Sequence, residues 1–450
     1  MKNILLIGCG RSSVYLLQWL EKAENYNNLK TTICDYQSKF TYSSLFPLLN
    51  TKYISLDIAD SSKLAPLIKS ANIVISMLPA NLHYGVALQC LEFSKHFITA
   101  SYLSQEIKAL HEKVKSKGLI FMMEAGLDPG LDHLSAKKEI DEIHQQSGQI
   151  ISFKSSTGGL VAPENDNNPW HYKISWNPRN VVMAGNGGAK YLHNGKEKFT
   201  PYQRLFKTTY PISVFESEDY EAYPNRDSLN YKSIYHLEEA ETLLRGTIRK
   251  KGFCNGWHQL VWLGMTDDNF IIENSEGMPL SDFTKLFIPE EFVHENLKES
   301  ICKFLNLEES SIAFQQLESL GLFSSLTIKT PKATPAQVLQ ELLLYNIPLR
   351  EKDKDMVIMQ HEILYKKKEI LHLRKSSLII IGEDESFTAM AKTVGIPIII
   401  IAKMILNNDF FEKGVLIPIS KNIYIPVLRE AENYGITFQI IENTEKKHMP

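Results

Sequence analysis

The stretch NILLIGCGRSSVYLLQWL, residues 3–20, decides the fold. Its first apolar run, residues 4–7, is continuous, as in a strand that is covered on both faces. Apolar residues then recur at helical spacing from Val14 to Leu20. Between the two lies the turn GCGRSS, residues 8–13. A strand, a glycine turn and an amphipathic helix in this order indicate a dinucleotide-binding βαβ unit.

This turn lacks the third glycine of the G-x-G-x-x-G pattern. The first two glycines permit the tight turn and the close approach of the pyrophosphate, and Ser13 stands where the third would pack the helix on the strand. Free helix N–H groups and the charge of Arg11 would hold the phosphates. We expect a cofactor loop formed by Gly8, Gly10, Arg11, Ser12 and Ser13; the alternative is a purely structural turn.

Asp35 bears on which dinucleotide is bound. It ends the expected second strand, where a carboxylate accepts hydrogen bonds from the ribose and repels a 2′-phosphate. Asp35 and its neighbour Tyr36 therefore favour NAD. Arg11 could instead pair with a 2′-phosphate, so NADP stays open, and Asp35 could be only a turn residue. Asp57, after the third strand, is either an adenine contact or a turn residue.

Strands and helices alternate through the first third of the chain. This alternation predicts an N-terminal Rossmann domain, a doubly wound parallel sheet. The expected strands are 4–7, 31–34, 53–56, 73–77, 97–100 and 119–123, and the helical patterns between them are 61–69, 81–93 and 104–117. Further along, a helical pattern at 131–145, mixed strand-like segments at 151–160 and 205–227, and a charged helical stretch at 284–330 predict a second, mixed α+β domain with a small helical piece.

Composition excludes several function classes. The net charge of −3 gives no basic surplus for nucleic acid, and no basic amphipathic segment points to a membrane surface. The apolar run at 396–406 is too short to span a bilayer and contains Lys403, so we expect a buried strand or helix. The five cysteines form no C-x-x-C pair, which predicts neither disulfides nor a metal site. The N-terminus lacks the pattern of a signal peptide, so we expect a cytoplasmic protein.

Six further blocks carry a specific resemblance. They are EAGLDPGLDHLSAKKEIDEIH (124–144), STGGLVAPENDNNPWHYKISW (156–176), YPNRDSL (223–229), RGTIRKKGF (245–253), DKDMVIMQHEI (353–363) and FTAMAKTVGIP (387–397). Together, and in this order, they resemble the saccharopine dehydrogenase (L-glutamate-forming) family, also called saccharopine reductase.

The resemblance implies a domain plan and a reaction. It implies a Rossmann domain at 1–127 completed by about 385–450, a substrate and dimerisation domain at 128–284 and 331–384, and a helical piece at 285–330. The chain would form a homodimer. It would interconvert saccharopine and water with L-glutamate and 2-aminoadipate 6-semialdehyde, using NAD or NADP, by hydride transfer from the carbon of a secondary amine. The substrate carries three carboxylates, so its pocket should be rich in cationic and hydroxyl side chains.

Residue roles follow from the same resemblance. Arg226 and Arg249 would anchor carboxylates, and the other implied substrate contacts are Ser101, Tyr102, Asp128, Ser175, Thr247 and Ile248. Leu127 would lie near the nicotinamide, and the remaining implied cofactor contacts are Ile58, Met77, Ala100, Ser101, Asp128 and Pro129. Asp128 is the candidate acid–base group, although bound water alone could serve. Lys173 could cover the pocket, and His133 and His171 are interpreted as structural.

Two other functions stay open at this stage. One is a related amine or imine oxidoreductase of the carboxynorspermidine dehydrogenase type, with another polyanionic substrate. The other is a dinucleotide-binding protein without catalytic activity. The joint presence of PNRD and GTIR favours the saccharopine enzyme over both.

Overall fold

The computed structural model describes residues 2–22, 29–37, 45, 51–215 and 217–445. The chain divides into two compact units, each built from two separate segments. Unit 1 comprises Met1–Gly148 and Ser386–Gln439, and unit 2 comprises Gln149–Glu385 and Ile440–Pro450.

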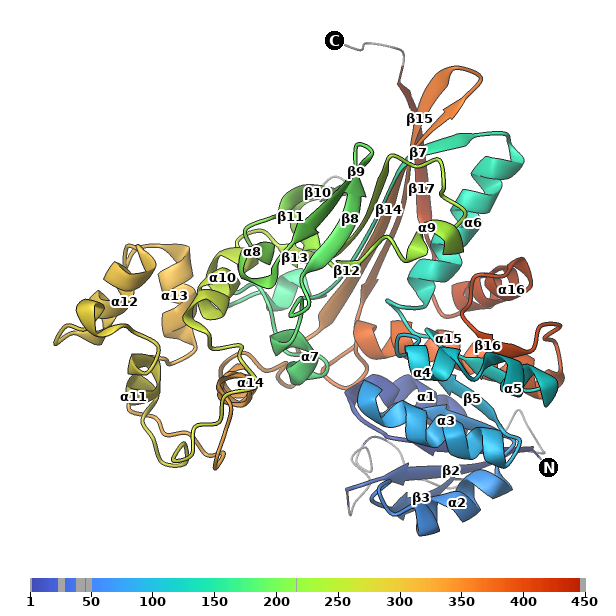
Figure 1. Ribbon diagram of the computed structural model, residues 1–450, viewed down its shortest axis with the longest axis horizontal. Helices are drawn as coiled ribbons and strands as arrows, with labels where there is room; N and C mark the ends of the chain where they lie inside the picture. Colours follow the sequence, from blue (N-terminus) through green and yellow to red (C-terminus); the bar gives the residue numbers. More distant parts are fainter. Residues whose placement is uncertain (1, 23–28, 38–44, 46–50, 216, 446–450) are drawn as a thin grey trace. The chain divides into compact units, whose positions relative to one another are not determined.

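Unit 1 is the predicted doubly wound α/β structure (Figure 1). Its described elements, in chain order, are β1 (Lys2–Ile7), η1 (Arg11–Ser13), α1 (Val14–Glu21), β2 (Leu29–Asp35), β3 (Thr51–Ser55), α2 (Ser61–Ser70), β4 (Ile73–Ser76), η3 (Ala80–Leu82), α3 (His83–Glu92), β5 (His96–Thr99), α4 (Gln105–Lys108), α5 (His111–Ser116), β6 (Ile120–Met122), α6 (Leu131–Gln145), α15 (Ala389–Asn407), β16 (Gly414–Leu416) and α16 (Lys421–Glu432).

The sheet of unit 1 has a topological switch point in its middle. Its strand order is β16-β6-β5-β4-β1-β2-β3, and every neighbouring pair is parallel. The chain moves outward in one direction from β1 and in the other from β4, so a crevice opens at the carboxyl ends of these two strands. The fold class is confirmed. The seventh strand, β16, was not predicted.

Helices cover both faces of this sheet. On one face, Val74 and Phe97 pack in a core with residues of α2 and α3, such as Leu64 and Val86. On the other, α15 lies so close to α1 that a Cβ at Gly395 would be 3.4 Å from the backbone nitrogen of Leu16. The burial of β1 and β4 on both sides explains why their sequences read as continuous apolar runs.

The apolar run expected at 396–406 forms part of α15. The whole helix, at 19 residues, is longer than the run, and in the described part of the chain it is the one helix long and apolar enough to cross a membrane. However, 78% of its most apolar window is buried inside the protein. Lys403 forms an ion pair with Glu430 of α16. These features are typical of a core helix.

Unit 2 contains a mixed sheet in the order β10-β11-β13-β7-β14-β15-β17, with β8, β9 and β12 off this path. The long hairpin of β14 and β15 is plain in Figure 1. The described elements are β7 (Gln149–Val161), η4 (Pro163–Asn165), α7 (Pro178–Val182), β8 (Ala189–His193), β9 (Lys196–Thr200), α8 (Tyr202–Leu205), β10 (Tyr210–Val214), β11 (Ser217–Pro224), β12 (Arg226–Asp227), α9 (Tyr231–Ile234), β13 (Thr242–Lys250), α10 (Phe253–Leu263), α11 (Leu280–Lys285), η5 (Glu290–Phe292), α12 (Leu297–Leu305), α13 (Ile312–Ser319), α14 (Pro335–Asn346), β14 (Asp355–Lys367), β15 (Ile370–Ile381) and β17 (Gln439–Glu445).

The boundaries between the units differ from the predicted ones. Helix α6 falls in unit 1, not after a boundary at residue 127, and Tyr424 of α16 donates a hydrogen bond to its Asp141 at 2.8 Å. Strand β17 extends the sheet of unit 2, so residues 440–445 do not return to the Rossmann unit. Helices α11 to α13 share one hydrophobic core with α10 and α14, and the segment 285–330 is therefore part of unit 2.

Candidate active site

The predicted cofactor loop lies at the switch point of unit 1. Gly8 adopts a φ of +88°, and a Cβ there would lie 3.0 Å from the carbonyl oxygen of Met77 at the end of β4. Only glycine accepts this conformation without strain, so Gly8 is fixed by the fold itself. The loop then enters η1 and α1, with Arg11 exposed at the first position of η1.

Gly10 and Ser13 have no such explanation within the protein. A Cβ at Gly10 would meet no atom within 4 Å, so packing does not require glycine there. The hydroxyl of Ser13 is buried, and in the described part of the chain it has no hydrogen-bond partner. A phosphate held at the helix N-terminus would explain both observations. It would occupy the open space beside Gly10 and accept a hydrogen bond from the Ser13 hydroxyl. The residues of the loop therefore fit a dinucleotide.

Asp35 is occupied with the loop itself. Its Oδ2 accepts hydrogen bonds from the amide of Cys9 at 2.8 Å and from the Cys9 thiol at 3.4 Å. This contact makes Asp35 a support of the glycine turn. Tyr36, by contrast, is 79% exposed. Asp57 is exposed and accepts from the amide of Ala59 at 2.9 Å, which is the turn role weighed for it above.

A buried histidine network lies at the carboxyl ends of β4 and β5. Nε2 of His83 is 2.7 Å from the hydroxyl of Ser101 and 3.2 Å from that of Thr99, and its Nδ1 is 2.9 Å from the hydroxyl of Ser76. His83 is only 2% exposed. Burial lowers its pKa to about 4, so the ring is neutral near pH 7.

Two buried histidines of unit 1 make its stability depend on pH. Burial lowers the pKa of both His83 and His96 to about 4, from an ordinary 6.5, and the charge of Lys413 adds to the effect on His96. The unfolded chain binds more protons between these values, so stability is lost as the pH falls from 6.5 towards 4. From pH 7 to pH 5 we expect a loss of roughly 2 kcal/mol from His83 and roughly 1 kcal/mol from the less buried His96.

Urea unfolding at pH 7 and pH 5 measures how much each histidine contributes to this loss of stability. The unmodified chain is compared with the variants His83→Gln and His96→Gln. Each variant should lose less stability than the unmodified chain on acidification. An identical loss in all three proteins would contradict the assignment.

Tyr102 and Asp128 meet beyond the ends of β5 and β6. The Tyr102 hydroxyl donates a hydrogen bond to Asp128 Oδ1 at 3.1 Å. Asp128 lies in a tight turn between two glycines that packing requires. A Cβ at Gly126 would lie 2.8 Å from that of Ala100, and one at Gly130 would lie 2.0 Å from a backbone oxygen of Gly126. The turn thus holds the Asp128 carboxylate, which is half-buried, in a fixed place.

A second buried group clamps the same two loops. Glu124 accepts from the amide of Leu103 at 2.9 Å and pairs with His133 Nε2 at 2.6 Å. His133 is fully buried, and its Nδ1 is 3.6 Å from Asp132, which in turn accepts from the amide of Gly130 at 2.6 Å. This chain of contacts connects the neighbour of Tyr102 to the turn of Asp128. His133 is therefore structural, as predicted.

In unit 2, Arg249 is a buried cation in an aromatic cluster. It is 4% exposed, and its guanidinium carbon lies 5.3 Å from the ring centre of Tyr172 and 5.2 Å from that of Phe253. Its Nη1 donates a hydrogen bond to the carbonyl of Ile248 at 2.9 Å, whereas its Nε is buried without a hydrogen-bond partner among the described residues. No carboxylate of the described residues pairs with it. A buried charge in this state calls for an anionic ligand.

Strand alternation places two threonines on the same face as Arg249. Thr247 lies two residues before Arg249 on β13 and is the register partner of Thr157 on β7. The hydroxyl of Thr157 is also buried without a partner among the described residues. Ser175 is buried in the loop before α7, where Trp176 donates to the hydroxyl of Tyr172 at 3.2 Å and so connects this loop to the aromatic cluster.

Three of the other predicted residues do not join this group. Ile248 points to the opposite face, into a core with Leu160 and Ala222, because side chains alternate along a strand; its side chain therefore cannot line the site. Arg226 is exposed on β12 with a φ of 53°, a left-handed conformation that is uncommon outside glycine. Lys173 is held by Asp353 at 2.7 Å.

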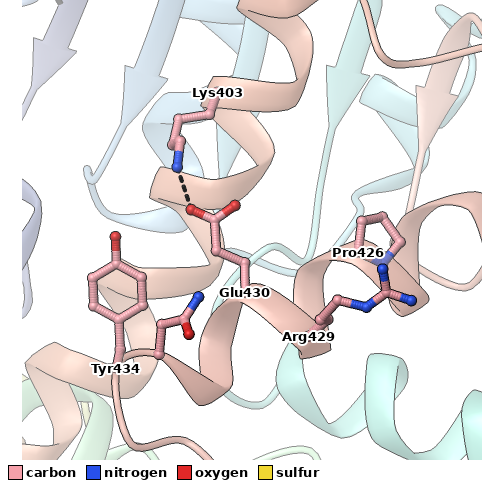
Figure 2. Close-up of a pocket in the computed structure, with 6 residues that line it drawn as sticks. Lys403, Pro426, Arg429, Glu430 and Tyr434 are labelled. Carbon is pink, nitrogen blue, oxygen red and sulfur yellow. Dashed lines mark hydrogen bonds and ion pairs between the residues drawn. The ribbon is translucent and has the colours of Figure 1, made fainter. Parts of the chain in front are cut away.

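A cavity of about 520 Å³ lies elsewhere in unit 1, along α15 and α16 (Figure 2). It is lined by Lys403, Pro426, Arg429, Glu430, Asn433 and Tyr434. It contains none of the predicted site residues. Figure 2 shows the side chain of Lys403 directed at Glu430. This ion pair neutralises part of the charge that lines the cavity.

Several residues near the predicted site residues were not themselves predicted. Ser76 and Thr99 could have been found from the rule that polar side chains at the ends of adjacent parallel strands come together. His83 begins a helix, so this rule does not point to it. Thr157 precedes the pair Gly158-Gly159, and a Cβ at Gly158 would lie 2.3 Å from the carbonyl oxygen of Ile248. Glycine inside a strand often marks such a close approach, which was the available signal.

Comparisons with known proteins identify the family of the chain. Residues 4–122 match the family model of the saccharopine dehydrogenase NADP binding domain, and residues 126–436 match that of the saccharopine dehydrogenase C-terminal domain. A fission yeast protein, the saccharopine dehydrogenase [NADP(+), L-glutamate-forming] of Schizosaccharomyces pombe, is 33% identical over 98% of this chain and 98% of its own. The protein of the same name from Saccharomyces cerevisiae is 32% identical over 97% of this chain and 98% of its own.

A solved structure agrees as well. Apo saccharopine dehydrogenase (L-Glu forming) from Saccharomyces cerevisiae superposes with a TM-score of 0.86 at 32% identity, covering 99% of this chain and 100% of that one. Both yeast names specify NADP(+), and so does the family model, against the preference for NAD that Asp35 predicted. In this chain the Asp35 carboxylate accepts the amide of Cys9 and so supports the turn. The chain belongs to the saccharopine dehydrogenase family.

Proposed function

We propose that this chain is an NADP-linked, glutamate-forming saccharopine dehydrogenase. The observation that carries the proposal is Arg249, a buried guanidinium without a carboxylate partner among the described residues, beside the unsatisfied hydroxyl of Thr157. Such a pair is suited to a substrate carboxylate, and saccharopine has three. The homodimer and the cytoplasmic location stay predictions.

Unit 1 carries groups suited to the hydride and proton transfers of this reaction. A nicotinamide ring, when bound, accepts hydride from the carbon on the lysine side of the secondary amine. Asp128 accepts the proton of the amine nitrogen and then serves the proton transfers as water adds to the imine and the carbon–nitrogen bond breaks. Tyr102, through its 3.1 Å hydrogen bond, orients the carboxylate for these steps. Glutamate and the semialdehyde are released.

A spectrophotometric assay tests the proposal. Purified chain is mixed with saccharopine and either NADP⁺ or NAD⁺, and the absorbance of the reduced nicotinamide is followed. We expect turnover with NADP⁺ at a kcat/KM at least tenfold above that with NAD⁺. Turnover of carboxynorspermidine and none of saccharopine would overturn the proposal in favour of the related enzyme, and nucleotide binding without any turnover would favour a non-catalytic protein.

The two loop glycines should respond differently to alanine. Gly8→Ala is strained and clashes with Met77, so it should destabilise unit 1 by about 1–3 kcal/mol as well as weaken cofactor binding. Gly10→Ala meets no protein atom and should leave the melting temperature unchanged. Its methyl group would instead occupy the space of the pyrophosphate and raise the Kd of NADPH at least tenfold. Calorimetric melting and fluorescence titration of NADPH separate the two effects, and unchanged NADPH affinity in Gly10→Ala would contradict a phosphate site.

Cofactor choice should depend on Arg11 more than on Asp35. Arg11 is exposed at the start of η1, beside the predicted phosphate loop, so Arg11→Ala should weaken NADPH about tenfold and NADH by less than twofold. Asp35→Ala removes the acceptor of the Cys9 amide and should weaken both nucleotides alike. Selective loss of NADH in Asp35→Ala would instead restore the role of a ribose ligand.

A further inference from the structure

The histidine network of unit 1 ends on a predicted site residue. Ser101, which follows β5, is half-buried, whereas the three residues behind it are not accessible: Ser76 is 0% exposed, Thr99 1% and His83 2%. The ring of His83 therefore cannot reach a ligand directly. Its shortest contact, 2.7 Å from Nε2 to the Ser101 hydroxyl, is the one that leads toward the ligand-binding edge of the sheet.

The ring has a fixed orientation. Nδ1 is held by the Ser76 hydroxyl at 2.9 Å, and the ring packs edge-on against Phe97 with 6.3 Å between ring centres. His83 begins α3, Ser76 ends β4, and Ser101 follows β5. Three elements thus converge on one imidazole. The backbone of Ser101 is held as well, because its amide donates to Thr99 Oγ1 at 3.3 Å.

We propose that His83 is a positioning residue that fixes the Ser101 hydroxyl for its ligand, with Ser76 orienting the ring. The proposal rests on the proposed function in one respect, that Ser101 contacts the substrate or the cofactor. A serine hydroxyl that rotates freely must lose that freedom on binding, whereas one already bonded to a rigid ring is preorganised.

A double-mutant cycle tests the coupling between the two residues. The Kd values of saccharopine and NADPH, and kcat, are measured for His83→Phe in the unmodified chain and in a Ser101→Ala background. Ser101→Ala should weaken one of the two ligands about tenfold, as expected for a lost hydrogen bond. His83→Phe should weaken the same ligand about fivefold in the unmodified chain and less than twofold in the Ser101→Ala background. Equal losses in both backgrounds would show that His83 does not act through Ser101.

Two conservative variants sharpen the test. The amide nitrogen of glutamine reaches the position of Nε2, so His83→Gln should keep the affinity within about twofold of the unmodified chain. Asparagine reaches only the position of Nδ1, so His83→Asn should lose as much as His83→Phe. Similar losses in the glutamine and asparagine variants would contradict a specific bond from Nε2.

His96, at the start of β5, provides a matched control. It is at the other end of β5, where its Nδ1 accepts from the amide of Ile120 at 3.1 Å. His96→Gln should lower the melting temperature without changing either Kd, and an effect on Kd equal to that of His83→Phe would make both histidines merely structural. Absence of saccharopine turnover in the unmodified chain would refute the proposed function alone, because the NADPH titrations still decide the role of His83. If Ser101→Ala weakens neither ligand, the positioning role is refuted.

Discussion

Arg249→Met should strongly impair saccharopine turnover while leaving the protein at least as stable as before. The buried guanidinium lacks a carboxylate partner among the described residues, so the folded chain carries the cost of its desolvation without full compensation. Methionine fills a similar volume among Tyr172 and Phe253 without that cost. The lost charge-assisted contact with a substrate carboxylate should lower kcat/KM about 10²–10³-fold, equivalent to roughly 3–4 kcal/mol.

Stopped-flow binding and steady-state kinetics check this result together with calorimetric melting. The Kd of NADPH should stay within twofold, since Arg249 serves the substrate. Arg179→Ala is the control: Arg179 is exposed and paired with Asp268, and its loss should change neither kinetics nor melting by much. A large drop in the melting temperature of Arg249→Met, with turnover retained, would assign Arg249 a structural role.

The same residue shows where reading the sequence succeeds and where it stops. The motif GTIR was enough to predict Arg249 as a site residue. The lack of a carboxylate partner for Arg249 among the described residues could not be predicted, because it depends on which strands pair. Thr157 faces the same side only through the parallel pairing of β7 with β13, about 90 residues apart in the chain. The direction of the Ile248 side chain follows from a simpler rule. Three consecutive strand residues cannot all face one side, so Ile248 faces away from Thr247 and Arg249.

The fold was easier to predict than its boundaries. Runs such as Ile73–Ser76 are buried on both faces, so their continuous apolar composition alone predicts a parallel strand. Strand β16 was not predicted although it is as long as the predicted β6, and β17 pairs with β15 across a large sequence separation. The turn of Asp128 was predicted only in part. Its glycines and proline indicate a turn, whereas the contact of Asp128 with Tyr102 depends on the geometry of the switch point.

Asp128→Asn should lower kcat about 10²–10⁴-fold while leaving both Kd values within about threefold. Asparagine has the same size and still accepts the hydrogen bond of Tyr102, so the turn between Gly126 and Gly130 is preserved. What it lacks is the ability to take a proton from the amine nitrogen and return it during imine hydration. Tyr102→Phe, which removes only the orienting bond, should lower kcat about tenfold.

Asp132→Asn separates this catalytic role from a role in holding the turn. Asp132 lies four residues further on, is fully buried, and accepts from the amide of Gly130. Its substitution should lower the melting temperature more than that of Asp128 does, and kcat less. Should Asp128→Asn keep more than about a tenth of the kcat of the unmodified chain, general acid–base catalysis by this carboxylate is refuted, since one positioned acid–base group contributes at least about a hundredfold. Bound water would then carry the proton, and the Tyr102–Asp128 pair would serve to place the substrate.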